Sequence, residues 1–319
     1  MRVVPLAGAA LFSTGIAFAP SARDPVVYAT IEKDSAIAVI STRTDSVVAL
    51  IRVGRRPRGM ALSPDGKTVY VALGQDNAIG VVDVAARTMV KTIPSGTDPE
   101  LVAISPDGKV LYVSNEEVAQ ASAIEVATGK VLFATSVGVE PEGIAVSPDG
   151  AKVYVTAETN NTVTVLEART GRVIRTFEVG HNPRTIRFTP DGRRAWVTAE
   201  AGGNVSVVDA GVDSVIKQFP IGDGTTKPVR VVFTPDGRTA YVTEGAGASV
   251  RVIDAVGDSV VARIAVGLRP WGIALSPDAR RLYTANGKSN SISVIDTGTR
   301  QVIATVAVGE RPCEVLYVP

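Results

Sequence analysis

Seven equivalent positions along the chain carry an unlike set of side chains, and these are the residues best placed to do chemistry. Each one directly follows a proline that ends a short loop. The set contains four charged residues, one aliphatic residue, one indole and one thiol: Arg58, Glu100, Glu142, Arg184, Val229, Trp271 and Cys313. Guanidinium groups bind carboxylate or phosphate through two parallel hydrogen bonds. The set therefore indicates recognition of a polar or charged ligand.

The counts of histidine and cysteine exclude much of the catalytic repertoire. The chain has one histidine, His181, and one cysteine, Cys313. Mechanisms and metal sites that need two imidazoles are excluded, as are intramolecular disulfides and zinc sites built on several thiolates. Cys313 is expected to be a small buried apolar residue rather than a nucleophile. A hydrolase would have only His181, the top-face glutamates such as Glu200, and the arginines to work with, and no spacing motif joins them.

The overall charge argues against a nucleic-acid partner. Lysine and arginine number 33 and aspartate and glutamate 32, so the formal net charge is +1. Nucleic-acid binding needs a basic surface, and an aromatic content of 5% offers few stacking platforms for single strands. With 45% hydrophobic and 20% charged residues, the chain has the composition of a folded globular protein.

A repeat of 42 residues organises the chain. A Gly-x-x-Pro loop begins at Gly54, Gly96, Gly138, Gly180, Gly267 and Gly309, with a stretched version from Gly222 to Pro228. A Ser/Thr-Pro-Asp-Gly turn or a close variant follows each of the first six loops. An aromatic residue comes next: Tyr70, Tyr112, Tyr154, Trp196, Tyr241 and Tyr283, with Tyr28 as a seventh at the start. Such a period is the signature of a repeat architecture.

Each repeat contains four short runs rich in valine and isoleucine. In the second unit these are Gly59–Leu62, Val69–Leu73, Ile79–Val84 and Met89–Ile93. Runs of this length and composition, separated by turn residues, predict strands and leave no room for a crossover helix. A single four-stranded sheet cannot cover both of its apolar faces, whereas sheets stacked around an axis bury both. The repeat therefore predicts an all-β fold, a β-propeller with four-stranded antiparallel blades.

The two ends of the repeat region together make one blade. The first unit supplies three strands, around Tyr28, Ile37–Ile40 and Val47–Ile51, and the last strand, Glu314–Val318, has no others after it. We expect the C-terminal strand to join the N-terminal blade and close a ring of seven. Residues 23–319 are then a single domain.

The repeat resembles a known family. The run from Gly138 to Gly150, Gly-Val-Glu-Pro-Glu-Gly-Ile-Ala-Val-Ser-Pro-Asp-Gly, is followed by Val153-Tyr-Val-Thr156 and Val163-Thr-Val-Leu166. These motifs resemble the YVTN-type, WD40-like β-propeller repeat family of exported bacterial and archaeal proteins. In such propellers the strand after Gly-x-x-Pro is innermost. The resemblance implies that the Gly-x-x-Pro loops and the loops after the aromatic strands share one face, here called the top face. The Ser/Thr-Pro-Asp-Gly turns lie on the opposite, bottom face.

This arrangement places the residues after the loop prolines at the top mouth of the axial channel. We expect the ligand or partner site to be formed by Arg58, Glu100, Glu142, Arg184, Trp271, Glu158 and Glu200. Trp271 is either a platform for the ligand or a plug in the channel.

Two sets of recurring acidic residues are explained by the repeat itself. Glu116, Glu158 and Glu200 hold equivalent positions in adjacent units and would suit calcium or magnesium. Because Glu32 shares the position, we read them as repeat residues and expect no metal and no cofactor.

An acid that follows the third strand of each unit is expected to cap the next turn: Asp83, Glu125, Glu167, Asp209, Asp254 and Asp296.

The function predicted from the sequence is recognition without catalysis. We expect a monomeric binding or scaffold protein that takes a protein partner or a small polar ligand on the top face. A lactonase-like hydrolase that uses His181 and Glu200 is the first alternative. A redox propeller associated with quinone or haem is the second, and it rests on fold kinship alone.

The first 22 residues are typical of a signal peptide. Arg2 precedes an apolar stretch from Val3 to Ala19, and Ala17-Phe18-Ala19 has the small-x-small pattern of a cleavage site. Pro20 disfavours cleavage directly after Ala19, so the cut is expected a few residues to either side; an uncleaved anchor is the alternative. We expect a periplasmic or secreted protein with no stable membrane insertion after cleavage.

Overall fold

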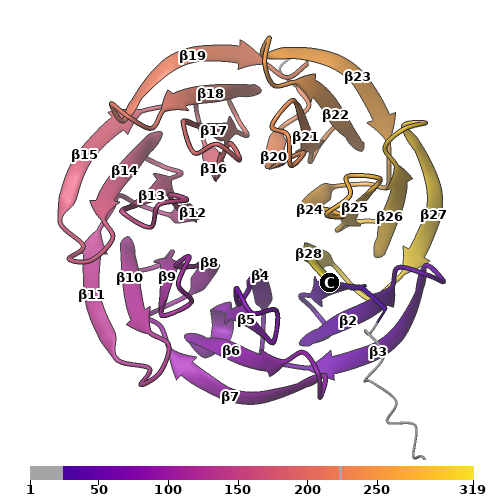
Figure 1. Cartoon of the computed structure of the whole chain (residues 1–319), viewed down its shortest axis with the longest axis horizontal. Coiled ribbons are helices and arrows are strands. Elements are labelled where there is room, and N and C mark those ends of the chain that lie inside the picture. The colour runs from indigo at the N-terminus through magenta and orange to yellow at the C-terminus, as the bar shows by residue number, and fades with distance from the viewer. Residues whose placement is uncertain (1–23, 223–224) are drawn as a thin grey trace, which may run out of the picture.

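A computed structural model describes residues 24–222 and 225–319. The predicted signal peptide lies outside this part of the chain. The described residues form 28 strands and one 3-10 helix, Gly74–Asp76, and the strands build seven four-stranded antiparallel sheets. Figure 1 shows the sheets as blades around a central axis. No helix in the described ranges has the length and hydropathy that crossing a membrane requires. The predicted seven-bladed β-propeller is confirmed.

Each blade runs from an inner strand to an outer one. Blade 1 consists of β28 (Pro312–Val318), β1 (Val26–Ile31), β2 (Ala36–Ser41) and β3 (Ser46–Arg52). Blade 2 consists of β4 (Pro57–Leu62), β5 (Thr68–Leu73), β6 (Ala78–Asp83) and β7 (Thr88–Pro94). Blade 3 consists of β8 (Pro99–Ile104), β9 (Val110–Asn115), β10 (Gln120–Glu125) and β11 (Val131–Ser136). Blade 4 consists of β12 (Pro141–Val146), β13 (Lys152–Ala157), β14 (Thr162–Glu167) and β15 (Val173–Glu178).

The remaining three blades follow the same order. Blade 5 consists of β16 (Pro183–Phe188), β17 (Arg194–Ala199), β18 (Asn204–Asp209) and β19 (Ser214–Pro220). Blade 6 consists of β20 (Pro228–Phe233), β21 (Thr239–Glu244), β22 (Ser249–Asp254) and β23 (Ser259–Ala265). Blade 7 consists of β24 (Pro270–Leu275), β25 (Arg281–Asn286), β26 (Ser291–Asp296) and β27 (Gln301–Ala307). In every blade the strand that begins at the loop proline lies nearest the axis (Figure 1).

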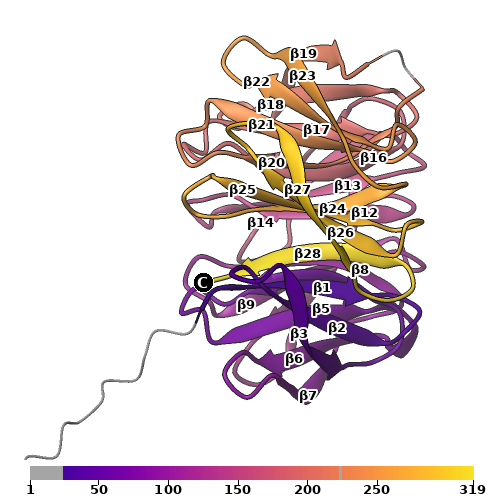
Figure 2. The same cartoon turned by 90° about the vertical axis from the view of Figure 1, so that its right-hand side faces the viewer.

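The ring is closed by pairing between the two ends of the repeat region. Strand β28 pairs antiparallel with β1, with Val26 opposite Val318 and Tyr28 opposite Leu316. Figure 2 shows β28, in yellow, beside the indigo β1. The predicted closure, with three strands from the start and one from the end, is confirmed.

The bottom turns are stabilised by the side chains of their own motif. In blade 2, Ser63 Oγ donates to Asp65 Oδ1 at 2.6 Å, and that oxygen also accepts the Lys67 N–H at 3.1 Å. These hydrogen bonds lower the pKa of Asp65. Gly66 adopts a left-handed conformation with φ +70°, which glycine tolerates best. The equivalent residue of blade 7 is Ala279, at φ +57°.

The acids after the third strands cap their turns, as predicted. The Asp83 carboxylate accepts the Ala86 N–H at 2.7 Å, and Asp296 accepts the Thr299 N–H at 2.7 Å. Glu167 accepts the Thr170 hydroxyl at 2.6 Å. These side chains are occupied by local turn structure.

The top loops are tied to one another by a repeated backbone hydrogen bond. The residue before each loop proline has a left-handed conformation, with φ between 52° and 63°: Arg56, Asp98, Glu140, Asn182, Lys227, Arg269 and Arg311. Its carbonyl accepts an N–H from the loop that follows the aromatic strand, as in Gly74 N to Arg56 O at 3.0 Å and Gly287 N to Arg269 O at 2.9 Å. The two sets of loops therefore lie on the same face, and each loop holds a fixed direction toward the axis.

The apolar core lies between the blades. Trp196, fully buried, meets Phe219 and Phe233 edge to face with ring centroids 5.2 and 5.1 Å away. Near the axis the packing is closer still. A Cβ on Gly272 would come within 2.6 Å of Glu314 Cα on the next inner strand, so this position has no room for a side chain. This packing makes the axial wall a rigid frame for side chains.

Candidate functional site

The residues predicted to form the site meet at the top of the axial channel. Arg58, Glu100, Glu142, Arg184 and Trp271 each stand one residue after the proline that begins an inner strand, and we call them the axial belt. The Arg58 guanidinium contacts Glu100 Oε2 at 2.6 Å. It also contacts Glu32 Oε2 at 3.2 Å. The regular start of each inner strand thus places these charges around one axis.

Arg184 connects the remaining predicted residues to the belt. Its Nη1 lies 2.5 Å from Glu142 Oε1, and its Nε lies 2.5 Å from Glu200 Oε2. It also pairs with Glu158. All seven residues predicted from the sequence are therefore in one cluster. Its four carboxylates pair with two guanidiniums and outnumber them, and whether the cluster binds a ligand stays a prediction.

Trp271 contacts residues that belong to several blades. Its side chain packs with Val229 and Cys313 and is 7% exposed. The Cζ atoms of Arg184 and Arg58 lie 5.5 and 5.9 Å from the ring centroid, within the range of cation–π attraction. Trp271 Nε1 is buried and has no hydrogen-bond partner in the described part of the chain. Of the two sequence expectations for Trp271, the geometry fits a plug in the channel.

Burial raises the pKa values of two groups at the top of the channel, the belt residue Glu142 and Cys313. The pKa of Glu142 rises to about 7, first because the carboxyl is buried and then because Glu100 lies nearby, although Arg184 opposes the rise. Burial also raises the pKa of the Cys313 thiol to about 11. The thiol therefore stays protonated at neutral pH. The prediction that Cys313 is a buried apolar residue is confirmed.

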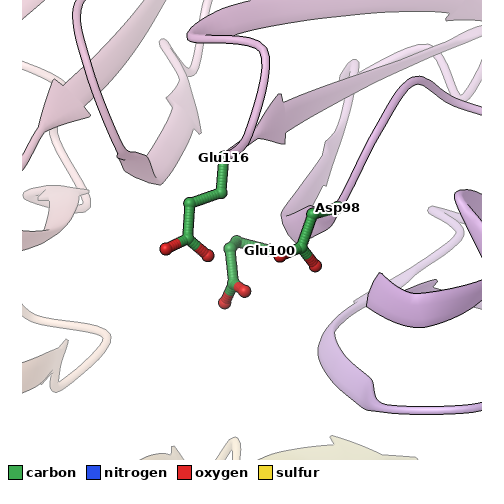
Figure 3. A group of neighbouring side chains, drawn as sticks. All are labelled: Asp98, Glu100 and Glu116. Atoms are coloured by element: carbon green, nitrogen blue, oxygen red, sulfur yellow. The ribbon is translucent and has the colours of Figure 1, made fainter.

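Three carboxylates of blade 3 converge beside the belt. Asp98, Glu100 and Glu116 present oxygens within 4.8 Å of one another, as Figure 3 shows. The Arg56 guanidinium pairs with all three, 2.6 Å from Glu100 Oε1 and 3.6 Å from Glu116 Oε2. One guanidinium cannot neutralise three carboxylates. Burial, a hydrogen bond with Glu100 and the charge of Glu100 together raise the pKa of Glu116 to about 8.

The glutamates considered as metal ligands are divided between two arginines. Glu116 lies with Arg56, whereas Glu158 and Glu200 both pair with Arg184. The carboxylate triad of blade 3 is therefore a different set from the one that the sequence suggested. A guanidinium already supplies positive charge to it.

His181 and Glu200, the acid–base pair of the hydrolase alternative, are not hydrogen-bonded to each other in the described ranges. His181 is exposed on its loop, where its backbone carbonyl accepts the Gly202 N–H at 3.0 Å. Glu200 is engaged with Arg184 and lies 3.8 Å from Lys227 Nζ. Within the described ranges no hydrogen bond links the His181 imidazole to Glu200.

A second group of cations lies at the rim between blades 7 and 1. Unlike the arginines of the axial belt, most of this group has no carboxylate partner in the ranges that the structure describes. The Arg269 guanidinium lies over Trp271, with Cζ 4.7 Å from the ring centroid. Lys288 is exposed, and Arg311 contacts Glu32 Oε1 at 3.0 Å. Neither Arg269 nor Lys288 has a carboxylate within ion-pair distance among the described residues. We call Arg269, Lys288 and Arg311 the rim cations. They border a depression of about 460 Å³, which the exposed acid Glu310 also lines.

The reason for the unpaired Arg269 lies in the next blade. Arg269 occupies the position of Arg56, whose partners Asp98 and Glu100 belong to the following blade. After blade 7 the equivalent residues are Arg311 and Cys313. Lys288 was not among the residues predicted from the sequence. The sequence signal for these unpaired cations was that Arg311 and Cys313 stand where the equivalent unit has the carboxylates Asp98 and Glu100.

Comparison with known proteins supports the fold and leaves the function open. The model of the choice-of-anchor I domain family matches residues 167–314. The YVTN-type assignment is therefore supported only as a seven-bladed propeller. Among curated proteins, none matches this chain.

Solved structures share the fold across nearly the whole chain. Hydrazine synthase of Kuenenia stuttgartiensis is 24% identical, with a TM-score of 0.78, over 90% of this chain and 99% of that one. A functionally unknown protein from Desulfotomaculum acetoxidans is 18% identical, with a TM-score of 0.78, over 91% and 99%. A proposed 6-phosphogluconolactonase from Bacteroides uniformis is 16% identical, with a TM-score of 0.79, over 93% and 100%. At these identities the likeness shows that the chain is a seven-bladed β-propeller.

Proposed function

We propose that this protein is an extracytoplasmic binding protein whose top face recognises an acidic segment of a protein partner at the rim cations. The observation that carries the proposal is the unpaired guanidinium of Arg269, held over Trp271. The equivalent Arg56 is surrounded by three carboxylates of the same chain. An acidic partner would supply to Arg269 the carboxylates that the next blade lacks.

The shape of the site favours a surface contact over a deep ligand slot. The space above Trp271, bounded by Glu32, Arg58 and Arg269, is only about 20 Å³. The larger depression beside it is bordered by exposed Lys288 and Arg311. A chain of carboxylates laid across the rim would meet the unpaired Arg269 and Lys288. Arg311, which is paired with Glu32, lies beside them, and Trp271 lies beneath Arg269. A guanidinium binds a carboxylate through two parallel hydrogen bonds, which fixes the geometry of the contact.

The extracytoplasmic location is part of the proposal. The match to the choice-of-anchor I domain model over residues 167–314 supports a surface or exported protein. A signal peptide at residues 1–22 and a monomeric state complete the proposal.

Hexaglutamate is a defined probe for this site. We expect the purified protein to bind fluorescently labelled hexaglutamate, with affinity that falls as salt is added because the contact is between exposed charges. The double variant Arg269→Ala/Lys288→Ala should lose at least tenfold in affinity. Arg55→Ala is the matched control, since Arg55 is a top-loop arginine already paired with Asp76 at 2.7 Å.

Two results would contradict this function. Equal binding by the double variant and by Arg55→Ala would remove the rim cations from the site. Tighter binding of a small acid such as succinate than of hexaglutamate would favour a small polar ligand instead of a protein segment.

The enzymatic and redox alternatives rest on shared fold. The resemblance to a proposed lactonase and to hydrazine synthase is at 16% and 24% identity, and a propeller scaffold hosts unrelated functions. The unlinked His181 and Glu200 give the hydrolase alternative no added support.

A further inference from the structure

The lower half of the axial channel is a cavity separate from the top-face site. It has a volume of about 510 Å³ and is lined by residues from all seven inner strands. Pro148, Thr189 and Pro190 of the bottom turns border it, so it opens on the bottom face. The axial belt stands at the other end of the same strands. A volume of this size is typical of a small-molecule site.

Most of the residues that line the cavity are aliphatic, although its exposed surface is polar and apolar in similar measure. Met60, Ile104, Val146, Phe188 and Leu316 all contribute to it from different inner strands. Such a lining favours an apolar ligand body, since contact with it removes apolar surface from water.

Three charged side chains interrupt this apolar wall. Arg230 Nε pairs with Glu314 Oε2 at 3.1 Å, and Arg230 Nη1 donates to Thr185 Oγ1 at 3.0 Å. Arg187 also lines the cavity, with neither an ion pair nor a side-chain hydrogen bond in the described ranges. The three charges sum to +1, and Arg187 carries the excess.

Arg187 is a departure from the repeat. At the equivalent position the other inner strands carry small or apolar residues: Ala61, Ala103, Ala145, Val232, Ala274 and Leu316. The protein surrounds Arg187 closely enough for limited solvation to lower its pKa, despite the nearby Glu314. Its side chain is nonetheless accessible to water inside the cavity. Four other blades have alanine at this position, so the propeller fold does not require an arginine there.

We propose that this cavity binds a monoanion with an apolar tail, such as a medium-chain carboxylate. Arg187 holds the anionic head, and the apolar wall takes the tail. One negative charge neutralises the excess of +1 left by Arg187, Arg230 and Glu314. This site lies at the opposite end of the axis from the rim cations, so it is independent of the proposed recognition of an acidic partner.

Isothermal titration calorimetry with sodium octanoate tests the proposal. Wild type should bind octanoate, and Arg187→Ala, which restores the residue of four other blades, should bind it at least tenfold more weakly. Arg193→Ala is the matched control, because Arg193 is exposed on the bottom turn of the same blade and does not line the cavity. It should bind octanoate like wild type.

Two ligands separate the head from the tail. Octanol lacks the charge and acetate lacks the tail, so each should bind at least tenfold more weakly than octanoate. In a second variant, Val146→Trp, the larger side chain fills part of the cavity near its opening. It should weaken octanoate binding while leaving Arg187 in place. Thermal unfolding of each variant confirms that it is folded.

The outcomes that overturn the proposal are specific. No octanoate binding by wild type would remove the site. Equal binding by Arg187→Ala or of octanol would remove the anionic head from recognition, and acetate binding as tight as octanoate would mean an adventitious ion only. Hexaglutamate binding at the rim is unaffected by any of these results.

Discussion

The guanidinium of Arg269 stacks on the indole of Trp271, 4.7 Å from the ring centroid, and has no carboxylate partner in the described part of the chain. Arg56, in the same position of another blade, is held by Asp98, Glu100 and Glu116. The comparison separates two roles for equivalent arginines. Arg56 is engaged within the structure, whereas Arg269 is positioned on an aromatic ring and open to an external acid.

Trp271 is expected to stabilise the fold as well as support Arg269. Replacing it with alanine leaves Val229 and Cys313 without their packing partner and should lower the free energy of unfolding by about 3 kcal/mol. Urea denaturation measures the loss. Trp271→Phe keeps an aromatic ring and should lose less than half as much. A loss below about 1 kcal/mol for the alanine variant, the effect of an average substitution, would contradict the plug assignment.

The carboxylate triad makes stability depend on pH in a defined direction. Because the pKa of folded Glu116 is about 8, against an ordinary value of 4.5, the folded state holds a proton that the unfolded state releases. The stabilisation by neutral Glu116 is complete below pH 4.5 and is lost as the pH rises through 8. Wild type should therefore lose stability between pH 5 and 8.5.

Glu116→Gln should reduce that loss, because glutamine keeps an uncharged hydrogen-bonding group at all pH values. We expect the reduction to be at least about 1.4 kcal/mol, the equivalent of one pKa unit. Urea unfolding at pH 5 and pH 8.5 gives the comparison. Glu117→Gln alters the exposed neighbouring residue and should follow the wild-type profile. Identical profiles for the two variants would show that Glu116 does not hold the proton.

The bottom turn of blade 7 offers a stabilising substitution. Ala279 adopts φ +57° where other blades use glycine, so Ala279→Gly should raise the free energy of unfolding by about 1 kcal/mol. Gly66→Ala is the reciprocal test, because a Cβ on Gly66 meets no atom within 4 Å. It should cost about 1 kcal/mol from backbone conformation alone. Lower stability of Ala279→Gly would refute this account of the turn.

Ring closure is expected to require β28. Deleting residues 310–319 removes the inner strand of blade 1 and the backbone partner of β1. The truncated protein should lose the single thermal transition of the intact ring or fail to remain soluble. Deleting Pro319 alone, which lies beyond the paired strand, should leave the transition in place. A single, unshifted transition for the longer deletion would contradict closure by β28.

The sequence predicts the fold well because each repeat carries its own turn chemistry. Ser63 and Asp65 stabilise a bottom turn locally, and the same motif recurs, so spacing alone indicates the strands between. The axial belt was predicted for the same reason: Arg58 and Arg184 follow equivalent prolines and therefore reach the same axis.

The pairing of these side chains could not be read from the repeat. Which carboxylate an arginine meets depends on the neighbouring blade and on distances across the axis. Arg187, Arg230 and Glu314 were not singled out, because they lie beyond the position directly after the loop proline, the one expected to face the channel. Their signal was the loss of small residues from inner strands, where Gly272 shows how little room there is.

The pairing of β28 with β1 sets the order in which the molecule can be completed during synthesis. Strand β1 is the first strand of the ring in chain order, and its inner neighbour β28 is the last strand of the ring. Before the two pair, blade 1 exposes an unpaired edge, and such edges invite association with other chains. Blade 1 therefore keeps an edge open to other chains until β28 has paired with β1.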